Sequence, residues 1–568
     1  MPSLLNTIST LRGWRHHRMF EAATRMPEAA QARVLREILT RNRDTVFGRE
    51  HGFADIRSPR DYVCRVPIRD YEALRPYVRR MLAGDTRVLT EDSPLMFATT
   101  SGTTGEPKHI PVTARWAEDM ADLMRLWAVR AMWDHPELLA RKLLTIVSPA
   151  VEGRTPTGLP FGSMSGLTYS RLPWLVRRRH VLPYEATLIR DHDARYFVAA
   201  RLALAGQVSS IGTPNPTTLL RLAETAEQHG EAIIRAIHDG TLGVDTLEPV
   251  EHAGCPGRDL REALQRAARP ARERAAFLLR VLDRRGRLVL GDCWPDLALV
   301  ACWLGGNAGV HARRLGEHFG AVPLRDLGLV ASEGRLTVPI EDDSSAGVLA
   351  VHAGFFEFVP EDRIDGPAAD TLLAHELEDG HRYYIVITEA NGLYRYDLND
   401  LVEVRGFHHA TPKVAFVRKG RDMLSITGEK LHLNHILAAV REAERRSGLD
   451  VWQFRVIPDV EATRYDVLIE PVSGEGLGSA QEFLAAFDAT LASVNVEYAS
   501  KRASHRLAAP RLHLMARGWS ERLCRGEFAH GRREHQHKWR AVAEEWDTVS
   551  RGEVERTEEL VVGQRYHV

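Results

Sequence analysis

Cysteine is scarce in this chain and scattered where it occurs. Five cysteines are spread over 568 residues, and no two of them form a CxxC pair. A disulfide framework and a zinc knuckle both need clustered cysteines, so neither is expected. The sequence also lacks a run of 18 apolar residues and an apolar N-terminal stretch long enough for a signal peptide. These absences predict a cytoplasmic protein with no membrane partner.

The sequence also lacks an excess of either acidic or basic residues. Lys and Arg number 75 against 76 for Asp and Glu, which gives no electrostatic reason to expect a nucleic-acid partner. What remains is ordinary globular composition, with 44% hydrophobic and 27% charged residues. At roughly 100–200 residues per domain, the length predicts two or more domains.

The first half of the chain alternates helical and strand patterns. Residues 18–42 have apolar side chains at helical spacing, with a break near their proline. Residues 207–212 have the pattern of a buried strand. The helix that follows is expected to be capped by Asn215, to begin at Pro216 and to end near Gly230. A strand, a turn and a helix in this order indicate layered α/β structure.

The second half changes character twice. Residues 348–418 contain several short β-type runs and the hairpin signal Asn391-Gly392, which predicts an antiparallel subdomain. Beyond residue 430 helices and strands alternate again, ending in an expected helix at 534–548. We therefore expect a mixed α/β (α+β) fold with a large N-terminal domain, 1–424, and a small mobile C-terminal domain, 425–568.

The densest polar segment, 97–108, reads FATTSGTTGEPK. Glycine lets the backbone approach an anion, hydroxyl and backbone N–H groups donate hydrogen bonds, and Lys108 adds a positive charge. This chemistry is typical of a phosphate site. It is not the P-loop, because Pro107 stands where GxxxxGK requires its second glycine. A polar surface turn is the alternative reading of the same residues.

Two carboxylates follow apolar or aromatic runs in a way that suits ligand binding. Glu333, in the segment ASEGR, can hold Mg²⁺ against phosphate oxygens, or Ser332-Glu333 can simply cap a turn. Asp400, before the run LVEV, is expected at the start of a strand, where it can accept both hydroxyls of a ribose. An ordinary hairpin aspartate is the alternative there.

The remaining candidates lie near the domain boundary and the C-terminus. Gly420 and Gly428 are spaced to act as a hinge or as a plain linker. Lys538 can be delivered to a polyphosphate by a mobile domain, or it can belong to a solvated helix face. The pair His408-His409 shows no convergent cysteine or carboxylate in the sequence, so no metal site is expected there.

Taken together, these segments resemble a known family. TTSGTTGEPK resembles the phosphate-binding motif of the adenylate-forming superfamily, which includes acyl-CoA synthetases and luciferases. The flanking runs FGREHGFADI, FFEFVP, GLYRYDLNDLVEV and QHKWR, in this order, resemble the auxin-responsive (Gretchen Hagen) family of acyl acid amido synthetases, and its bacterial members in particular. The likeness extends from about residue 30 to about 540.

The resemblance implies specific roles within an ATP site. It implies that the ATP phosphates are bound by Thr100, Ser101, Gly102, Thr103, Thr104 and Gly105, with Lys108 at the edge of the loop. It further implies that Glu333 binds magnesium beside Ser332, that Asp400 binds the ribose, and that Arg421 contacts the nucleotide. Gly420, Gly428 and Lys430 form the hinge, and Lys538 is the mobile catalytic lysine.

Three positions depart from the family pattern. The adenine-stacking tyrosine is replaced by Leu329, the Gly-Asp step is Asn399-Asp400, and the proline expected after Lys538 is Trp539. The implied function is an ATP- and magnesium-dependent ligase that adenylates a carboxylic acid and transfers the acyl group to an amine, that of an amino acid. An acyl-CoA ligase and a non-catalytic ATP-binding or regulatory protein are the alternatives.

Overall fold

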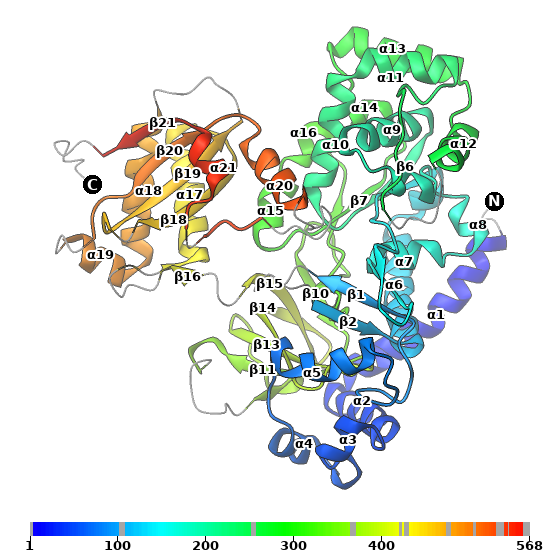
Figure 1. The fold of residues 1–568 in the computed structure, drawn as a ribbon, viewed down its shortest axis with the longest axis vertical. Helices are drawn as coiled ribbons and strands as arrows, with labels where there is room; N and C mark the ends of the chain where they lie inside the picture. The colour runs from blue at the N-terminus through cyan, green and yellow to red at the C-terminus, as the bar shows by residue number, and fades with distance from the viewer. Residues whose placement is uncertain are drawn as a thin grey trace. The chain divides into compact units, whose positions relative to one another are not determined.

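The chain divides into two compact units, Met1–Val417 and Arg418–Val568, which are described separately. The structure is a computed structural model. It describes residues 4–100, 108–251, 257–363, 371–419, 423–424, 426, 431–459, 461–472, 479–503, 507–529, 539–543 and 545–560. Figure 1 shows the elements of both units.

Helices open the first unit. The break predicted at the proline is confirmed, because α1 (Leu4–Arg25) ends just before it and α2 (Pro27–Asn42) begins with Pro27 at its first turn. Three further helices follow before the first strand: α3 (Val46–Glu50), α4 (Pro59–Arg65) and α5 (Tyr71–Leu82). Ser58 and Asp70 cap the last two by accepting hydrogen bonds from backbone N–H groups.

A small mixed sheet comes next and contains the ends of the predicted phosphate loop. Its strand order is β2-β1-β5-β4. These strands are β1 (Met96–Thr100), β2 (Lys108–Val112), β4 (Gly153–Arg154) and β5 (Pro160–Gly162). The long helix α6 (Ala114–Asp134) follows β2 directly and buries Trp116 in the core.

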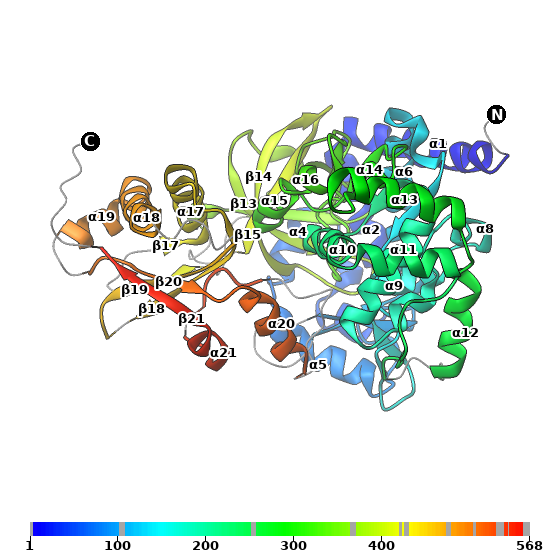
Figure 2. The same ribbon diagram turned by 90° about the horizontal axis from the view of Figure 1, so that it is seen from above.

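A parallel sheet forms the α/β layer that the sequence predicts. Its order is β3-β6-β7-β8, with strands β3 (Lys142–Thr145), β6 (Val208–Gly212), β7 (Leu299–Ala301) and β8 (Leu324–Arg325). Its neighbouring helices group together in both Figure 1 and Figure 2. They are α9 (His192–Ala205), α10 (Pro216–Gln228), α11 (Gly230–Asp239) and α13 (Arg272–Arg285).

The helix after β6 begins as predicted and ends earlier than predicted. Asn215 caps α10 through its side-chain oxygen, which accepts a hydrogen bond from Thr217 N at 3.0 Å, and Pro216 is the first residue. Gly230, expected at the helix end, instead begins α11. His229 separates the two helices, and α11 ends at Gly240, whose positive φ closes it.

Shorter helices complete this region of the first unit. They are α7 (Met164–Ser170), α8 (Trp174–Arg177), α12 (Gly257–Ala267), α14 (Leu290–Cys293), α15 (Gly306–Ala312) and α16 (Leu315–Phe319).

The antiparallel subdomain predicted within 348–418 is a seven-stranded sheet with the order β12-β11-β13-β14-β15-β10-β9. Its strands are β9 (Thr337–Val338), β10 (Ala346–Leu349), β11 (Phe355–Pro360), β12 (Leu372–Leu373), β13 (Arg382–Thr388), β14 (Tyr396–His408) and β15 (Thr411–Lys419).

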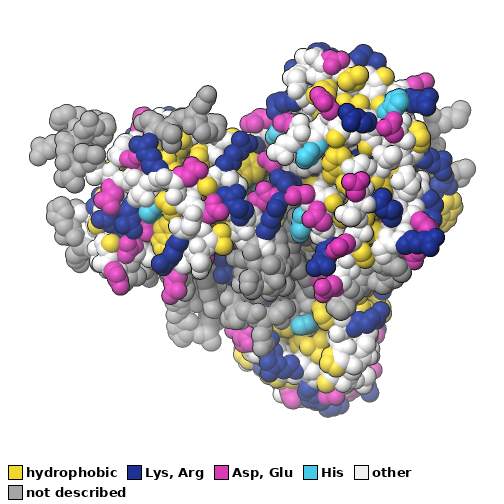
Figure 3. Space-filling model, turned by 45° about the horizontal axis from the view of Figure 1, so that its top comes forward, with side chains coloured by type: hydrophobic (Ala, Val, Ile, Leu, Met, Phe, Trp, Pro, Cys, Tyr) yellow, Lys and Arg dark blue, Asp and Glu magenta, His cyan; other side chains and the backbone are white. Residues whose placement is uncertain are grey.

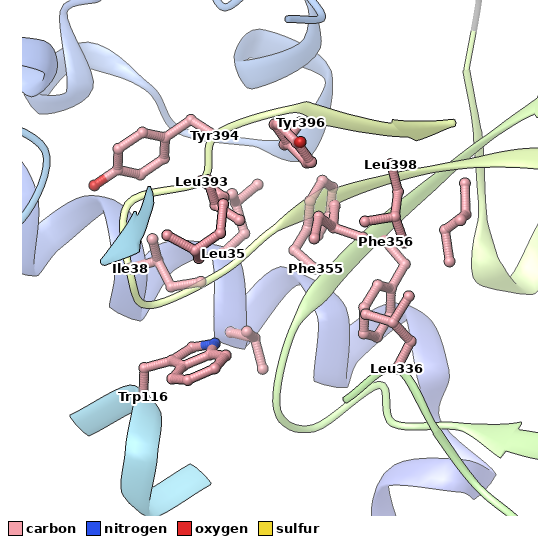
Figure 4. Close-up of a cluster of buried hydrophobic side chains, with 14 of the residues drawn as sticks. Leu35, Ile38, Trp116, Leu336, Phe355, Phe356, Leu393, Tyr394, Tyr396 and Leu398 are labelled. Carbon is pink, nitrogen blue, oxygen red and sulfur yellow. The ribbon is translucent and has the colours of Figure 1, made fainter. Parts of the chain in front are cut away.

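The main core lies between this sheet and the N-terminal helices. Leu35 and Ile38 of α2 pack in one buried cluster with Phe355 and Phe356 of β11 and with Trp116. Figure 4 shows these side chains together with those of the segment that leads into β14. Burial of this many large apolar groups fixes the sheet against the helices, at about 1.5–3 kcal/mol for each fully buried side chain.

The second unit is a smaller α/β layer. Its four-stranded sheet has the order β18-β19-β20-β21, and β16 pairs with β17 in a separate ribbon. The strands are β16 (Met423–Leu424), β17 (Leu431–His432), β18 (Val451–Asp459), β19 (Arg464–Pro471), β20 (Arg511–Met515) and β21 (Val554–Glu559). The helices are α17 (Leu433–Ser447), α18 (Ala480–Val494), α19 (Val496–Ala503), α20 (Trp519–Ala529) and α21 (Thr548–Gly552).

The helix predicted at 534–548 is wrong over its described part. Residues 539–543 lie beside β18 in extended form, with Val542 bridging Val456 in parallel register. Val456 N donates to Ala541 O at 2.8 Å, and Ala543 N donates to Val456 O at 3.1 Å. The indole of Trp539 packs in the core of this unit, so tertiary contacts override the local helical composition.

The distribution of charged side chains on the surface reflects the balance of acidic and basic residues in the sequence. Among the described residues on the face in Figure 3, acidic and basic side chains are interspersed rather than grouped by sign. Within the described residues, no helix is long and apolar enough to cross a membrane. The predicted mixed α/β class is confirmed by the layered sheets of both units.

Candidate active site

Lys108 stands at the foot of the loop predicted to hold phosphate. Strands β1 and β2 are antiparallel, and Thr100 pairs directly with Lys108 at their last register position. Residues 101–107 lie outside the described residues, so Ser101, Gly102, Thr103, Thr104 and Gly105 are not placed. The pairing still fixes where this loop leaves the sheet and where it returns.

Ser332 and Glu333 occupy the tip of a tight hairpin. Ala331 N donates to Gly334 O at 2.8 Å, and Leu336 N donates to Leu329 O at 2.8 Å. Glu333 is 8% exposed, whereas Ser332 is half-buried. The hairpin therefore presents a fixed, largely buried carboxylate, which is more than the simple turn cap that the sequence also allowed.

Asp400 lies inside β14 rather than at its start. Tyr384 pairs with Leu401 while Val386 pairs with Asp397, so β14 bulges between these two positions. Asn399 within the bulge has φ 54°, a left-handed conformation that asparagine tolerates better than most residues do. Asparagine can thus replace the glycine of the family pattern and keep Asp400, which is 2% exposed, in its place.

Tyr396 links the three segments, and the sequence analysis missed it. Its hydroxyl accepts a hydrogen bond from Lys108 Nζ at 3.3 Å. Burial raises the pKa of Tyr396 well above its usual value, and the nearby carboxylates of Glu333, Asp397 and Asp400 also raise it. The hydroxyl is therefore protonated and able to donate at any physiological pH. Lys108 contacts this side chain directly, and the charges of Glu333 and Asp400 act on it.

The neighbours of Lys108 and Tyr396 explain how this contact is held. Lys108 Nζ also lies 5.6 Å from the ring centroid of Tyr71, at the start of α5. The Tyr71 hydroxyl in turn accepts a hydrogen bond from His109 N at 2.7 Å. Asp397 N donates to Arg69 O at 2.8 Å, which ties the start of β14 to the segment before α5. In Figure 4 Tyr396 stands at the edge of the buried cluster. The only sequence signal for it was its place in LYRYD, two residues after another tyrosine.

The carboxylate of Glu389, which the sequence analysis also missed, packs against the hairpin that carries Glu333. Glu389 Oε1 lies where side chains on Gly334 or Gly354 would stand, 3.0 and 2.5 Å from their ideal Cβ positions. Burial raises the pKa of Glu389 well above its usual value, and the Asp119 carboxylate on α6 adds to the rise. The carboxyl group of Glu389 therefore fills the space beside both glycines, where a larger residue would have to displace it.

The hinge and C-terminal candidates cannot be placed. Gly420, Arg421, Gly428, Lys430 and Lys538 all lie outside the described residues. The residue after Lys538 is described: Trp539 Nε1 donates to Phe454 O at 2.6 Å, and its ring meets Trp519 edge-on at 5.2 Å. Trp539 is therefore an anchor for the chain next to Lys538.

The expectation that His408-His409 has no carboxylate partner is wrong. Glu21 of α1 lies between them, with Oε1 3.0 Å from His408 Nε2 and Oε2 2.7 Å from His409 Nε2. The two segments are nearly 400 residues apart in sequence, so no local pattern could have paired them.

Comparisons with known proteins point to one family. Three family models match the chain in order: the GH3 family N-terminal domain at 16–324, the central domain at 347–419 and the C-terminal domain at 434–545. An indole-3-acetic acid-amido synthetase, GH3.2 of Arabidopsis thaliana, is 24% identical over 450 residues, covering 75% of this chain and 80% of the relative. The jasmonoyl-L-amino acid synthetase JAR6 of Nicotiana attenuata is 24% identical over 522 residues, 88% of each chain.

A solved structure shows the same fold at low sequence identity. The GH3.15 acyl acid amido synthetase superposes with a TM-score of 0.83 at 20% identity, covering 96% of this chain and 97% of its own. The N-terminal family model alone spans more than half of the 568 residues. The chain belongs to the GH3 family.

Proposed function

We propose that this chain is an ATP-dependent acyl acid amido synthetase. It adenylates a carboxylic acid, releasing pyrophosphate, and then transfers the acyl group to an amine, that of an amino acid. The observation that carries the proposal is the hydrogen bond between Lys108, at the foot of the loop, and the buried Tyr396, together with the buried carboxylates of Glu333 and Asp400, in a GH3-family chain. The relatives named above are amido synthetases, which supports an amine rather than a thiol as acceptor.

The residues around Tyr396 suit a magnesium–nucleotide substrate. One ammonium at the foot of the loop and two buried carboxylates form a mixed donor set, which suits a polyanion, a hard cation and a ribose diol. In our proposal Thr100 to Gly105 bind the phosphates, and Glu333 beside Ser332 holds magnesium. Asp400 accepts the ribose hydroxyls. Magnesium, when bound, neutralises charge on the phosphate oxygens.

The adenine side of the site is apolar in this chain. Leu329, in place of the stacking tyrosine, is partly buried and packs against the large core. It is therefore proposed to contact adenine through dispersion alone, without a polar handle.

The chemical roles follow from charge. As the substrate carboxylate attacks the α-phosphorus, negative charge accumulates on the departing pyrophosphate. Lys108, held by Tyr396, is placed to neutralise it at the edge of the loop. The amine then attacks the acyl-adenylate carbonyl and AMP leaves.

We assign nucleotide and acyl-acid binding to residues 1–424 and a mobile role to 425–568. Gly420, Gly428 and Lys430 serve as the hinge, Arg421 contacts the nucleotide, and Lys538 is the lysine delivered for adenylation.

One experiment separates this function from its rivals. ATP–pyrophosphate exchange is measured with a panel of aryl, indolyl and fatty acids, and the active acid is then incubated with amino acids or with coenzyme A. We expect acid-dependent exchange and an amide product. A thioester formed with coenzyme A and no amino acid would identify an acyl-CoA ligase. Nucleotide binding without any acid-dependent exchange would identify a non-catalytic protein.

A further inference from the structure

Glu21 and two adjacent histidines form a cluster that the proposed function does not use. His408 ends β14, and His409 begins the short turn into β15. The carboxylate oxygens of Glu21 lie 3.0 Å from His408 Nε2 and 2.7 Å from His409 Nε2. One ligand atom from each of the three residues lies within 4.8 Å of the other two.

A third imidazole faces the same carboxylate. His17 precedes Glu21 by one helical turn, and its Nδ1 lies 3.9 Å from Glu21 Oε1. This nitrogen is buried and has no hydrogen-bond partner among the residues that the structure describes. His17 thus brings a buried ring nitrogen close to the carboxylate of the cluster.

The backbone holds the two segments together independently of these side chains. Ala410 N and the Thr411 hydroxyl both donate to Thr24 O at 3.0 Å, which fastens the hairpin tip to the end of α1. His409 has φ 53°, a left-handed conformation that is uncommon outside glycine. With this turn the two imidazole centroids lie 4.4 Å apart on the same side of the hairpin.

Aromatic packing orients the imidazoles. Phe20 stacks on His408 at 5.8 Å with an interplanar angle of 18°. Trp133 of α6 meets the ring of His17 edge-on at 4.6 Å. The rings of His408 and His17 are therefore held by groups outside the cluster, as is usual for ligands whose orientation matters.

We propose that Glu21, His408 and His409, with His17 as the fourth ligand, bind a divalent transition-metal cation, and that Zn²⁺ fits best. Three imidazoles and one carboxylate are a typical zinc donor set, and tetrahedral bonds of about 2.0–2.2 Å place ligand atoms roughly 3.3 Å apart. Glu21 lies 3.0 and 2.7 Å from the two histidine nitrogens, slightly closer than this spacing. His17 Nδ1, 3.9 Å from Glu21 Oε1 and outside the three-residue group, would shift to complete the site. Ca²⁺ and Mg²⁺ prefer all-oxygen sites and are not expected here.

The charge of Arg130 opposes a cation in this cluster. Its Nη1 lies 3.9 Å from Glu21 Oε1. Ligating carboxylates are often hydrogen-bonded by outer groups, and a guanidinium paired with the ligating oxygen fits that position. Without a cation, the same residues form only a hydrogen-bonded clamp in which two imidazoles share one carboxylate.

The site should stabilise the fold rather than assist catalysis. Asp400 lies on the same strand, eight residues from His408, which is roughly 26 Å at 3.3 Å per residue. A cation bound only by the folded chain adds stability that rises with its concentration over its Kd. It would lock α1 onto the β14–β15 hairpin.

The test uses the full-length, tag-free protein after chelator treatment. Calorimetric titration with zinc chloride should show one saturable site. His408→Ala/His409→Ala should weaken it by about 100-fold or more, beyond the about 10- to 100-fold cost of losing an outer partner. His381→Ala is the matched control, because His381 is an exposed histidine beside a carboxylate, 3.7 Å from Glu378, that does not belong to the cluster. It should bind like the wild type.

Two further measurements guard against a misfolded variant. Glu21→Gln keeps the size of the side chain and should also weaken zinc binding. Co²⁺ added to the wild type should give the intense visible absorption of a tetrahedral site, and zinc should raise its melting temperature but not that of the double variant. The proposal is overturned if no saturable binding occurs, if the double variant binds zinc as tightly as the wild type, or if Co²⁺ keeps its aqueous spectrum.

Discussion

At the scale of single residues, Tyr396 organises the candidate site. Its side chain is buried, and its hydroxyl accepts a hydrogen bond from Lys108. The carboxylates of Glu333 and Asp400 lie near enough to affect its pKa. Tyr394, two residues earlier, is equally buried, but its hydroxyl donates to Leu89 O at 2.6 Å, a backbone group in the core. Comparing variants of Tyr396 and Tyr394 therefore separates an effect on the candidate site from an effect on core packing.

Tyr396→Phe should slow ATP–pyrophosphate exchange while leaving the melting temperature nearly unchanged. Losing a hydrogen bond to a charged group costs about 1.5–3 kcal/mol, or roughly ten- to a hundredfold in rate. Tyr394→Phe should lower stability and leave exchange intact. In Lys108→Ala/Tyr396→Phe the two losses should not add, because the tyrosine acts through the lysine. Additive losses, or equal slowing by Tyr394→Phe, would show that Tyr396 is only structural.

Asn399 supports a second prediction at this scale, because its φ of 54° holds the bulge that carries Asp400. Asn399→Gly should be tolerated, since glycine adopts this conformation without strain. Asn399→Ala should cost about 1 kcal/mol of stability and raise the KM for ATP more than that for the acid. Steady-state kinetics with each substrate varied in turn would test this. If alanine and glycine behaved alike, the backbone of the bulge would not control Asp400.

At the scale of elements, the small unit depends on one buried ion pair. Asp466 of β19 lies directly opposite Arg511 of β20, and its carboxylate accepts a hydrogen bond from Arg511 Nε at 2.8 Å. Burial opposes ionisation of Asp466, but hydrogen bonds from His513, Arg511 and Trp546 outweigh burial and lower its pKa. Because the folded pKa lies below the unfolded one, the stabilisation is present above the usual carboxyl pKa. It is lost as pH falls through the folded pKa.

Asp466→Asn should therefore destabilise the second unit at neutral pH, by about 1–3 kcal/mol, because Arg511 keeps Asp459 as a partner at 3.0 Å. The difference from the wild type should shrink as the pH falls below about 4. Calorimetry of the full chain from pH 7 to pH 3 would measure it. Asp459→Asn is the control, because Asp459 also contacts Arg511 at 3.0 Å but is 25% exposed. A pH-independent difference would contradict the linkage.

Local patterns predicted most elements and few of their long-range partners. The strand at 207–212, the Asn215 cap and the break before Pro27 are confirmed, because capping and alternation are encoded within a few residues. The helix expected at 534–548 is wrong because Trp539 binds β18, which lies some 85 residues earlier. Contacts such as Lys108 with Tyr396 depend on how separate elements meet, and no local pattern encodes them.

At the scale of the whole molecule, the GH3 family models extend over both units, so the likeness is not confined to one domain. The site described around Tyr396 belongs entirely to the first unit. Lys538, which family resemblance makes the mobile lysine, belongs to the second. If both take part in adenylation, that half-reaction needs groups from both units.

The last prediction concerns Lys538 and tests the mobile role proposed for the second unit. Trp539 is anchored to Phe454 and packs against Trp519, so the chain beside Lys538 moves with the second unit rather than as a free tail. If the lysine meets ATP only during adenylation, its charge stabilises the departing pyrophosphate more in the transition state than in the ground state. Lys538→Ala should then slow pyrophosphate exchange by about 10²-fold or more, the size seen when one preorganised electrostatic contact is removed.

Capture of a separately supplied acyl-adenylate by the amine should be almost unaffected in Lys538→Ala, because by then the lysine has moved away. Lys413→Ala is a suitable control, since that lysine pairs with Glu341 at 2.8 Å on the first unit and should leave both half-reactions normal. Single-turnover measurements of each half-reaction distinguish the outcomes. Equal slowing of both would mean that Lys538 is structural or that the second unit does not move. Normal rates in both would place it on a solvated surface, with Trp539 anchoring the chain for packing alone.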